Sequence, residues 1–216
     1  MEERMTRGIR RVTGMRARGM VMLCALLLGA CSTVRQTPPT ADSPKPRPPS
    51  LAGRAVLVLP AQPAPGVPRN ARTGEVVPGL DAELAYWLDD LGPRVNWKFP
   101  PEIRASLERN AMLNIDIDAL AVGSFHVAQV KNIGDPLLGD LRRLAALLDA
   151  RWALVPVAVA YVPRDEGGRA EAALALIDTY GGQVLWYAVM AGEPGREGSG
   201  DVAASLARSI AQILLP

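Results

Sequence analysis

Three apolar runs stand almost end to end in this chain: WALVPVAVAYV (152–162), AEAALALID (170–178) and VLWYAVM (184–190). Each has the length of a strand, and the segments between them, Asp165-Glu166-Gly167-Gly168 and Tyr180-Gly181-Gly182, have the composition of hairpin turns. The pattern predicts a three-stranded antiparallel meander. Both faces of these strands are mostly apolar, so we expect the second face to be covered as well, by the C-terminal helix or by another chain.

The residues around the meander alternate between strand and helix patterns. Further strands are expected at 54–60, 94–99 and 119–130. Helices are expected at 81–91, 100–110, 136–148 and 202–213, where apolar residues recur at helical spacing. Asp135 is the expected cap of the third helix and Pro136 its first residue. The order predicts an α/β (α+β) sandwich, with a mixed sheet, a C-terminal three-strand meander and helices mainly on one face.

The first thirty residues have the three parts of a secretion signal. Six arginines against two glutamates make this region basic, an apolar run of nine residues covers Met20–Leu28, and Gly29-Ala30 precede Cys31. Nine residues are about half of what a membrane-spanning helix needs, so the run is too short to remain as an anchor. We therefore expect residues 1–30 to be a signal peptide that is cut between Ala30 and Cys31.

The residues Leu28-Gly29-Ala30-Cys31 resemble the lipobox of bacterial lipoproteins. The resemblance implies that Cys31 becomes the first residue of the mature chain and carries a diacylglycerol thioether and an N-acyl chain. Two or more acyl chains give stable membrane anchoring where one does not. Ser32 follows the cysteine in place of aspartate, which by resemblance to sorted lipoproteins implies the outer membrane, facing the periplasm.

Removal of this signal changes the charge and the cysteine content. The chain has a net charge of +2, and the six arginines and two glutamates leave with the signal, so the remainder is close to −2. Such a chain offers no basic surface for a nucleic-acid backbone. The only cysteines are Cys24, inside the signal, and Cys31, which leaves none for a disulfide, a zinc site or a thiol nucleophile.

Residues 31–50 have the composition of a tether. Ser32–Ser50 holds six prolines, and Val34 is its one sizeable aliphatic residue. Such a segment has too little apolar surface to fold, and proline-rich linkers run extended at about 3.1 Å per residue. We expect the lipidated Cys31 and a tether reaching up to roughly 60 Å, followed by one domain at 51–216.

Two long segments rich in glycine or proline interrupt the regular pattern. Residues 61–79 are expected to be functional or mobile, because structureless loops of this length are uncommon in compact domains. In one alternative they cover a ligand pocket beside the first strand. Residues 192–200 lack the Lys-Ser or Lys-Thr pair of a phosphate-binding loop, so we expect a flexible connector there.

Candidate catalytic and metal-binding residues are few. His126 is the only histidine, and Ser124 would share its face on an alternating strand, but a general base also needs an orienting carboxylate. Asp116 and Asp118 supply two carboxylates without the glycine turn and further oxygens of a calcium loop. We therefore expect no catalytic residue, no metal and no cofactor, and a protein that is not an enzyme.

The adjacent Trp186 and Tyr187 are expected to face opposite sides of one strand, so one of them points away from the core. Exposed aromatic residues are typical of protein interfaces. Trp186, Tyr187 and Trp97 are therefore the candidate interface residues, with core packing against the helices as the alternative for Trp186.

Two motifs resemble a family of small periplasmic lipoprotein domains. They are Ala150-Arg151-Trp152-Ala153-Leu154-Val155, which follows a helix, and Asp178-Thr179-Tyr180-Gly181-Gly182-Gln183-Val184-Leu185-Trp186. Both are similar to segments of the activators of penicillin-binding proteins, the curli-secretion lipoprotein and the N-terminal domain of the Tol-system propeller protein. The glycine common in these proteins is absent at Val155-Pro156, and no amphipathic hairpin pair suited to a secretion pore is present. The resemblance therefore favours the members that form no pore.

These observations together favour a non-enzymatic, membrane-anchored envelope lipoprotein that acts as a protein-binding or assembly accessory module. Its expected partners are the membrane, through the lipid on Cys31, and an envelope protein or a second copy of itself, but no nucleic acid. The alternative is a periplasmic ligand-binding or transport-accessory lipoprotein. Function inferred from fold resemblance is analogy. Both the protein-binding and the ligand-binding hypothesis therefore have to be argued from a specific site.

Overall fold

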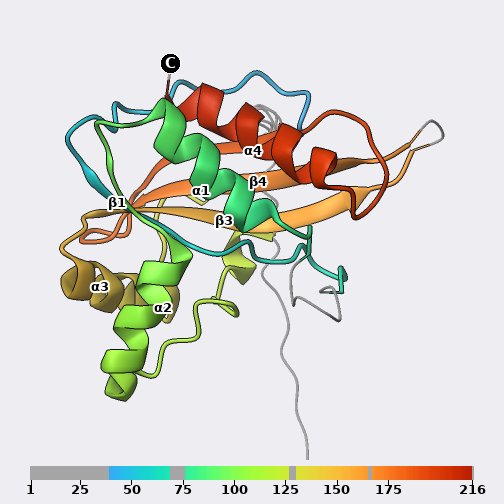
Figure 1. Ribbon diagram of the computed structural model, residues 1–216. Coiled ribbons are helices and arrows are strands. Elements are labelled where there is room, and N and C mark those ends of the chain that lie inside the picture. The colour runs from blue at the N-terminus through green and yellow to red at the C-terminus, as the bar shows by residue number, and fades with distance from the viewer. Residues whose placement is uncertain (1–38, 69–75, 127–129, 165–166, 216) are drawn as a thin grey trace, which may run out of the picture. The chain divides into compact units, whose positions relative to one another are not determined.

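The computed structural model describes residues 39–68, 76–126, 130–164 and 167–215 (Figure 1). The expected signal peptide and Cys31 lie outside these residues. The strands are β1 (Ala55–Val58), β2 (Asn96–Lys98), β3 (Trp152–Val162), β4 (Arg169–Asp178) and β5 (Val184–Ala191). The helices are α1 (Leu80–Leu91), α2 (Pro100–Arg109), α3 (Leu137–Leu148) and α4 (Gly200–Leu214), with short 3-10 turns at Ala111–Leu113 and Gly123–His126. Within the described ranges, none of the helices combines the length and the apolar character needed to span a bilayer.

The strands form one mixed sheet in the order β2-β1-β3-β4-β5. β1 is parallel to both of its neighbours, with Val56 opposite Trp97 on β2 and Trp152 on β3. β3, β4 and β5 are antiparallel, and Leu176 on β4 lies opposite Leu154 on one side and Trp186 on the other. The predicted α+β fold and its C-terminal meander are confirmed.

Pro156 lies in the middle of β3, where a proline has no N–H to give to the ladder. The register of β3 against β4 shifts between Pro156 and Ala158. On the other side of β3, the chain beyond β1 continues the pairing: Gln62 N–H donates to the Pro156 carbonyl at 3.0 Å, and Val159 N–H donates to the Gln62 carbonyl at 2.8 Å. The first residues of the expected loop 61–79 therefore extend the line of β1 along β3.

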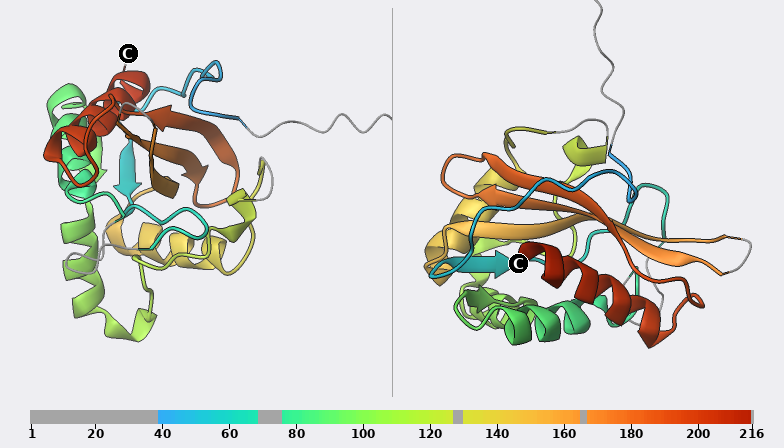
Figure 2. Two further views of the ribbon diagram at one scale, coloured as in Figure 1. Left: turned by 90° about the vertical axis from the view of Figure 1, so that its right-hand side faces the viewer. Right: turned by 90° about the horizontal axis from the view of Figure 1, so that it is seen from above.

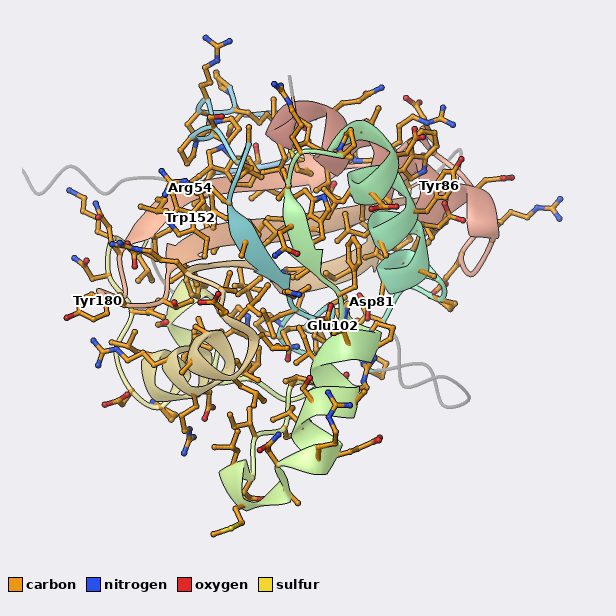
Figure 3. The ribbon with its side chains drawn as sticks, turned by 60° about the vertical axis from the view of Figure 1, so that its left-hand side comes forward. Arg54, Asp81, Tyr86, Glu102, Trp152 and Tyr180 are labelled. Carbon is orange, nitrogen blue, oxygen red and sulfur yellow. The ribbon has the colours of Figure 1, made fainter. Side chains whose placement is uncertain are left out.

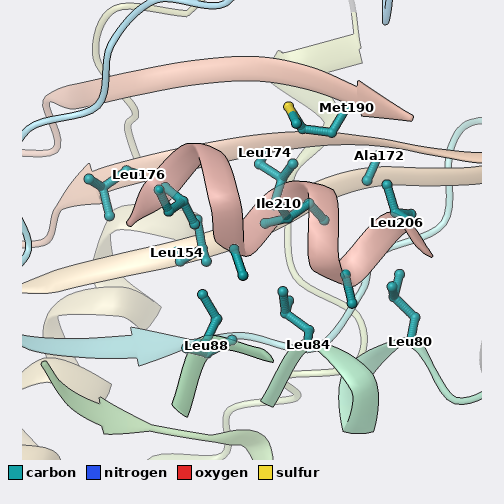
Figure 4. Packing of buried hydrophobic residues seen from close by; sticks show 14 of the residues in the cluster. Leu80, Leu84, Leu88, Leu154, Ala172, Leu174, Leu176, Met190, Leu206 and Ile210 are labelled. Carbon is teal, nitrogen blue, oxygen red and sulfur yellow. The ribbon is translucent and has the colours of Figure 1, made fainter. Parts of the chain in front are cut away.

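One face of the sheet is covered by α1 and α4, which lie side by side (Figures 1 and 2). Leu80, Leu84 and Leu88 recur at helical spacing on α1 and are fully buried, because that stripe meets α4 and the sheet. On α4, Leu206 and Ile210 pack over Leu174 and Leu176 of β4 (Figure 4).

The other face of the sheet is covered by α3, by the start of α2 and by the segment between them. Leu137, Leu141 and Leu144 on α3 and Ile103 on α2 are buried with Val155 of β3. The expectation that the helices lie mainly on one face therefore needs correction, since they are shared between the two faces. Sheet residues such as Val155 and Ala175 are apolar because helices and loops of this same chain cover them.

The predicted strand at 119–130 is wrong over its described part, 119–126 and 130. Leu120, Val122 and Phe125 are buried, which produced the apolar pattern, but local bonds from Val122 N–H to the Leu120 carbonyl and from Phe125 N–H to the Val122 carbonyl make tight turns. The Leu120 N–H donates to Oε1 of the buried Gln62 at 3.0 Å, so a side chain takes the place of a strand partner. α3 also begins one residue later than predicted, at Leu137, without a side-chain cap from Asp135.

Residues 39–50 belong to the same compact unit as the rest of the domain, which corrects the expectation of an extended tether over that part. Ala41 is buried, and the Trp186 indole N–H donates to the Pro46 carbonyl at 2.8 Å. The segment follows β5 along the side of the sheet before the chain enters β1 (Figure 2). The five prolines of residues 39–50 are consistent with the lack of helix and strand there, but they did not prevent docking.

Candidate interaction surface

The three aromatic residues predicted at an interface are not exposed. Trp186 is only 3% exposed and lies in the core beneath α4 and residues 39–50. Trp97 is also buried, and its indole N–H donates to the Gly92 carbonyl at 3.2 Å. Tyr187 is half-buried on the opposite face, as the alternation predicts, and stacks on Phe125 with 6.0 Å between ring centroids. Burial raises the pKa of the Tyr187 phenol.

The remaining candidate residues are engaged in structural bonds. His126 lies in a 3-10 turn, where Nε2 is 3.0 Å from the Val157 carbonyl and must therefore be the donor of that bond. Asp118 pairs with Arg104 at 2.8 Å, and Asp116 accepts the Asp118 N–H at 3.0 Å. Among the described residues, no group of three or more His, Cys, Asp or Glu side chains is arranged to hold a metal ion.

The glycine-rich segment 192–200 is pinned, which corrects its expected role as a flexible connector. The Tyr161 hydroxyl donates to the Gly195 carbonyl at 2.7 Å and accepts the Gly168 N–H at 2.8 Å. A Cβ on Gly168 would lie 2.4 Å from the Tyr161 ring, and one on Gly192 would lie 2.5 Å from Ser205 Oγ. The glycines are therefore required for close packing.

The β4–β5 turn presents the most exposed aromatic side chain of the described residues. Tyr180 is 78% exposed and projects from the end of the molecule that also carries Arg54 and Trp152 (Figure 3). Asp178 Oδ1 accepts the Tyr180 N–H at 2.9 Å, and the Thr179 hydroxyl donates to the Arg151 carbonyl at 2.7 Å. These two hydrogen bonds fix the turn backbone that carries the exposed Tyr180 ring.

Two arginines flank this turn. Arg142 on α3 donates to the Tyr180 carbonyl from Nε at 3.0 Å and from a terminal nitrogen at 2.6 Å. Arg151 pairs with Asp178 at 2.9 Å. Burial works to raise the pKa of Asp178, but hydrogen bonds from Arg151 and from the N–H groups of Tyr180 and Gly181 outweigh it, so this pKa lies below its ordinary value.

A shallow depression of about 770 Å³ lies between Tyr180 and α3. Its lining includes Arg142 and Arg151, and Ala145, Ala146 and Ala150 supply apolar surface. We call it the Tyr180 surface. A second depression of about 700 Å³ shares Ala146 and lies between α3 and the end of α2. It is lined by Met112, Leu113 and Leu147 with Arg109 and Arg143. Met112 is fully exposed.

Sequence reasoning missed both depressions. Tyr180 lies in a predicted hairpin turn, and Arg142 and Arg143 are exposed residues of the helix expected at 136–148, so none of the three positions was singled out. The signal that the sequence did offer was the aromatic residue Tyr180 next to two turn glycines, Gly181 and Gly182.

The expected ligand pocket under residues 61–79 has a partial counterpart. Val76, Val77 and Pro78 line a depression of about 440 Å³ together with Tyr161 and Glu197. It lies beside the end of β3 and the start of α4, and not beside β1. The Tyr161 hydroxyl is already bonded to Gly195 and Gly168, which leaves Glu197 as the ionisable group in the lining.

The domain is an α+β sandwich, with a mixed five-stranded sheet, helices on both faces and a surface at one end that carries arginine and tyrosine. No protein-family model matches the sequence, and no curated protein matches it. The fold is similar to the PelC dodecamer from Paraburkholderia phytofirmans, at 17% identity and a TM-score of 0.38 over 80% of this chain and 94% of that one. It is also similar to lipoprotein GNA1162 from Neisseria meningitidis (16% identity, TM-score 0.39, 68% and 82% of the two chains). The LpoB C-terminal domain from Salmonella enterica is a third such structure (12% identity, TM-score 0.38, 70% and 86%). Likenesses at this level assign no family.

Proposed function

We propose that this chain is a non-enzymatic, lipid-anchored protein of the bacterial cell envelope, at the outer membrane, whose domain binds another protein through the Tyr180 surface. The anchor rests on the sequence alone, through the basic start, the short apolar run and the lipobox that ends at Cys31. The binding role rests on the exposed tyrosine and the depression beside it.

The observation that carries the binding role is the 78% exposure of Tyr180 on a turn whose backbone is fixed by Asp178, Thr179 and Arg142. A tyrosine offers a large contact area for the loss of only two side-chain torsions, and a fixed backbone loses little further entropy on binding. Tyrosine and arginine are also the residue types that concentrate binding energy at interfaces.

The chemistry of the depression selects an acidic partner segment. Arg142 bonds to a carbonyl group, which does not neutralise its charge, while Arg151 is offset by Asp178. An incoming carboxylate would therefore find an arginine in the lining, and the alanines of the same lining would accept a small apolar side chain next to it. We thus infer a partner segment that carries an Asp or Glu beside an apolar residue.

Site-specific photocrosslinking in cells tests this function. A photoreactive phenylalanine analogue replaces Tyr180 in the chain with its own signal and anchor, and the control carries it at Tyr86, which is 61% exposed on α1. We expect a discrete adduct from position 180 that position 86 does not give, and at least a fivefold loss when Arg142→Glu is added. An adduct of twice the chain's mass identifies the partner as a second copy. Identical adducts from both positions, or no effect of Arg142→Glu, contradict the proposal.

The second candidate function is ligand binding at the depression lined by Val77 and Tyr161, because the described end of segment 61–79 forms part of its wall. A small-molecule screen by thermal shift tests it. A ligand of this site would raise the melting temperature of the unmodified protein and not that of Val76→Glu, a half-buried position of the same lining. Binding that survives Val76→Glu places the ligand elsewhere.

A further inference from the structure

We propose that the face of β5 around Trp186 is a groove for an extended, proline-rich segment, and that residues 39–50 of the same chain fill it as a detachable strap. The strap lies between Cys31 and the domain, so its docking limits how far the domain can stand from the membrane. This second half rests on the proposed lipid anchor, whereas the groove itself does not.

The centre of the groove is the bond between Trp186 and Pro46. The indole N–H donates to the Pro46 carbonyl at 2.8 Å, and the Trp186 ring is only 3% exposed in the docked structure. Prolines at 44, 46, 48 and 49 give the strap an extended backbone with few N–H groups. Proteins that recognise polyproline segments use aromatic-lined grooves in the same way, because the ligand is already extended before it binds.

The far end of the strap is held by a buried alanine and an ion pair. Ala41 is 6% exposed, and Asp42 lies 3.4 Å from Arg169 at the start of β4. Since Glu171 of β4 pairs with Ala191, this end lies near the end of β5, while Pro46 lies near its beginning. The strap therefore follows β5 in the opposite direction over a path fixed at two points.

The strap is attached without a ladder of backbone hydrogen bonds. Among the described residues, the backbone–backbone bond given for residues 39–50 is internal, from Ser43 N–H to the Thr40 carbonyl. The Asp42 carboxylate is largely exposed, which weakens its ion pair. Release of the strap would therefore leave every strand pairing of the sheet in place, so that docking and release are two states of one folded domain.

Docking changes the reach of the tether. With the strap docked, only residues 32–38 remain between the lipid and the domain, a reach of at most about 25 Å in an extended chain. With the strap released, residues 32–50 reach up to roughly 60 Å. The domain could therefore contact an envelope protein that lies farther from the membrane than the docked reach only when the strap is released.

Hydrogen exchange on the full mature chain carrying Cys31→Ala tests the groove in the absence of lipid. We expect the amides of Thr40 and Ser43, which donate to Ser43 Oγ and to the Thr40 carbonyl, to exchange at least tenfold more slowly than in a free peptide of residues 38–50. Ala41→Lys should restore the peptide rates, while the matched variant at an exposed alanine, Ala52→Lys, should not. The amides of β3 and β4 should keep their protection in both variants. Peptide-like exchange in the unmodified protein, or the same response to both lysines, overturns the groove.

The free peptide 38–50 then tests whether the groove binds in trans. In Ala41→Lys, we expect the indole N–H resonance of Trp186, assigned by its loss in Trp186→Phe, to move and to return when millimolar peptide is added. A resonance that ignores the peptide overturns a binding groove and leaves only local packing.

Energy transfer in vesicles tests the membrane distance. The donor dye is attached to a cysteine introduced by Gln212→Cys at an exposed position of α4. This cysteine is the only free thiol of the lipidated chain, and the acceptor is a dye-labelled lipid in the bilayer. We expect at least a twofold loss of transfer in Ala41→Lys and none in Ala52→Lys. Equal transfer in all three proteins overturns the strap's effect on distance. Failure of all three proteins to bind vesicles instead overturns the lipid anchor. The conclusion on the groove from hydrogen exchange is not affected by that outcome.

Discussion

The Trp186 indole N–H and the Pro46 carbonyl lie 2.8 Å apart although 140 residues separate them in the chain. This bond places a proline-rich segment that has the composition of a linker against the last strand of the sheet. It also explains why an apolar strand at the side of the sheet carries a tryptophan: the indole has both an apolar cover and a polar acceptor within its own chain.

The proposed lipid anchor would be attached through the Cys31 sulfur, which would carry the diacylglycerol. Cys31→Ala should abolish incorporation of radiolabelled palmitate and release the protein from membranes, because no other cysteine follows residue 30. The circular dichroism and melting temperature of the domain should not change, since β1 begins at Ala55. Ser32→Ala is the control and should retain label. Full labelling of the Cys31→Ala protein would contradict the anchor.

Tyr180→Ala should weaken partner binding without destabilising the fold. The side chain is 78% exposed, so its loss should change the free energy of unfolding by less than about 0.5 kcal/mol. Binding of the crosslinked partner should fall by about tenfold or more, the loss expected of an interface anchor. Tyr86→Ala, measured by the same titration, should bind normally. A large drop in urea stability for Tyr180→Ala would mean that the ring is structural.

Asp178 should make stability depend on pH in the acid range. Its pKa is lowered in the folded state, so its contribution is complete above the unfolded-state pKa of about 3.9 and is lost as pH falls through the lower folded-state pKa. Asp178→Asn should therefore cost about 1 kcal/mol at pH 7, discounted because Arg151 is largely exposed. The two proteins should converge in urea unfolding as the pH falls through the lowered folded-state pKa of Asp178. A constant difference across pH would exclude an electrostatic origin.

Gln62 should be a stability determinant despite its place in a loop. Its side chain donates to the Pro60 and Ile117 carbonyls at 2.9 Å each and accepts the Leu120 N–H at 3.0 Å, while it is almost fully buried. Gln62→Leu keeps the volume but leaves three backbone groups without these bonds, at a cost of about 2–4 kcal/mol. Gln212→Leu, at an exposed helical site, should be near neutral. Equal melting temperatures for the two variants would contradict this role.

Tyr161 should hold segment 192–200 in place. Tyr161→Phe removes the hydroxyl that bonds both Gly195 and Gly168, and it should cost about 1–2 kcal/mol of unfolding free energy. Amide exchange between 193 and 198 should accelerate while that of α4 stays slow. The control Tyr86→Phe should change neither. Unaltered exchange in 193–198 would mean that the glycine packing and the bonds from Gly195 N–H to the Gly168 carbonyl and from Glu193 N–H to Ser205 Oγ fix the segment without the hydroxyl.

The sheet and helices could be predicted from the sequence because their signals are local. Each signal is contained in a short stretch of sequence. Leu84 and Leu88 show the helical spacing of α1, the three apolar runs show the strands of the meander, and the glycines between them show the turns. The strand predicted at 119–130 was wrong for the opposite reason. Its apolar residues are buried by contacts with distant elements, and its backbone bonds to Gln62, a partner that no local pattern reveals.

The candidate sites divide along the same line. The signal peptide and the lipobox are defined by the order of residues along the chain. The prediction that Cys31 is lipidated therefore needs only the sequence. Exposure is a property of the packed molecule, and only the tertiary structure decided that Trp186 and Trp97 are buried while Tyr180 and Met112 are not. Composition correctly excluded helix and strand from residues 39–50, because proline cannot supply their N–H bonds. Whether those residues extend into solvent or lie against Trp186 depends on a surface built from β5 and α4, which exists only once the chain has folded.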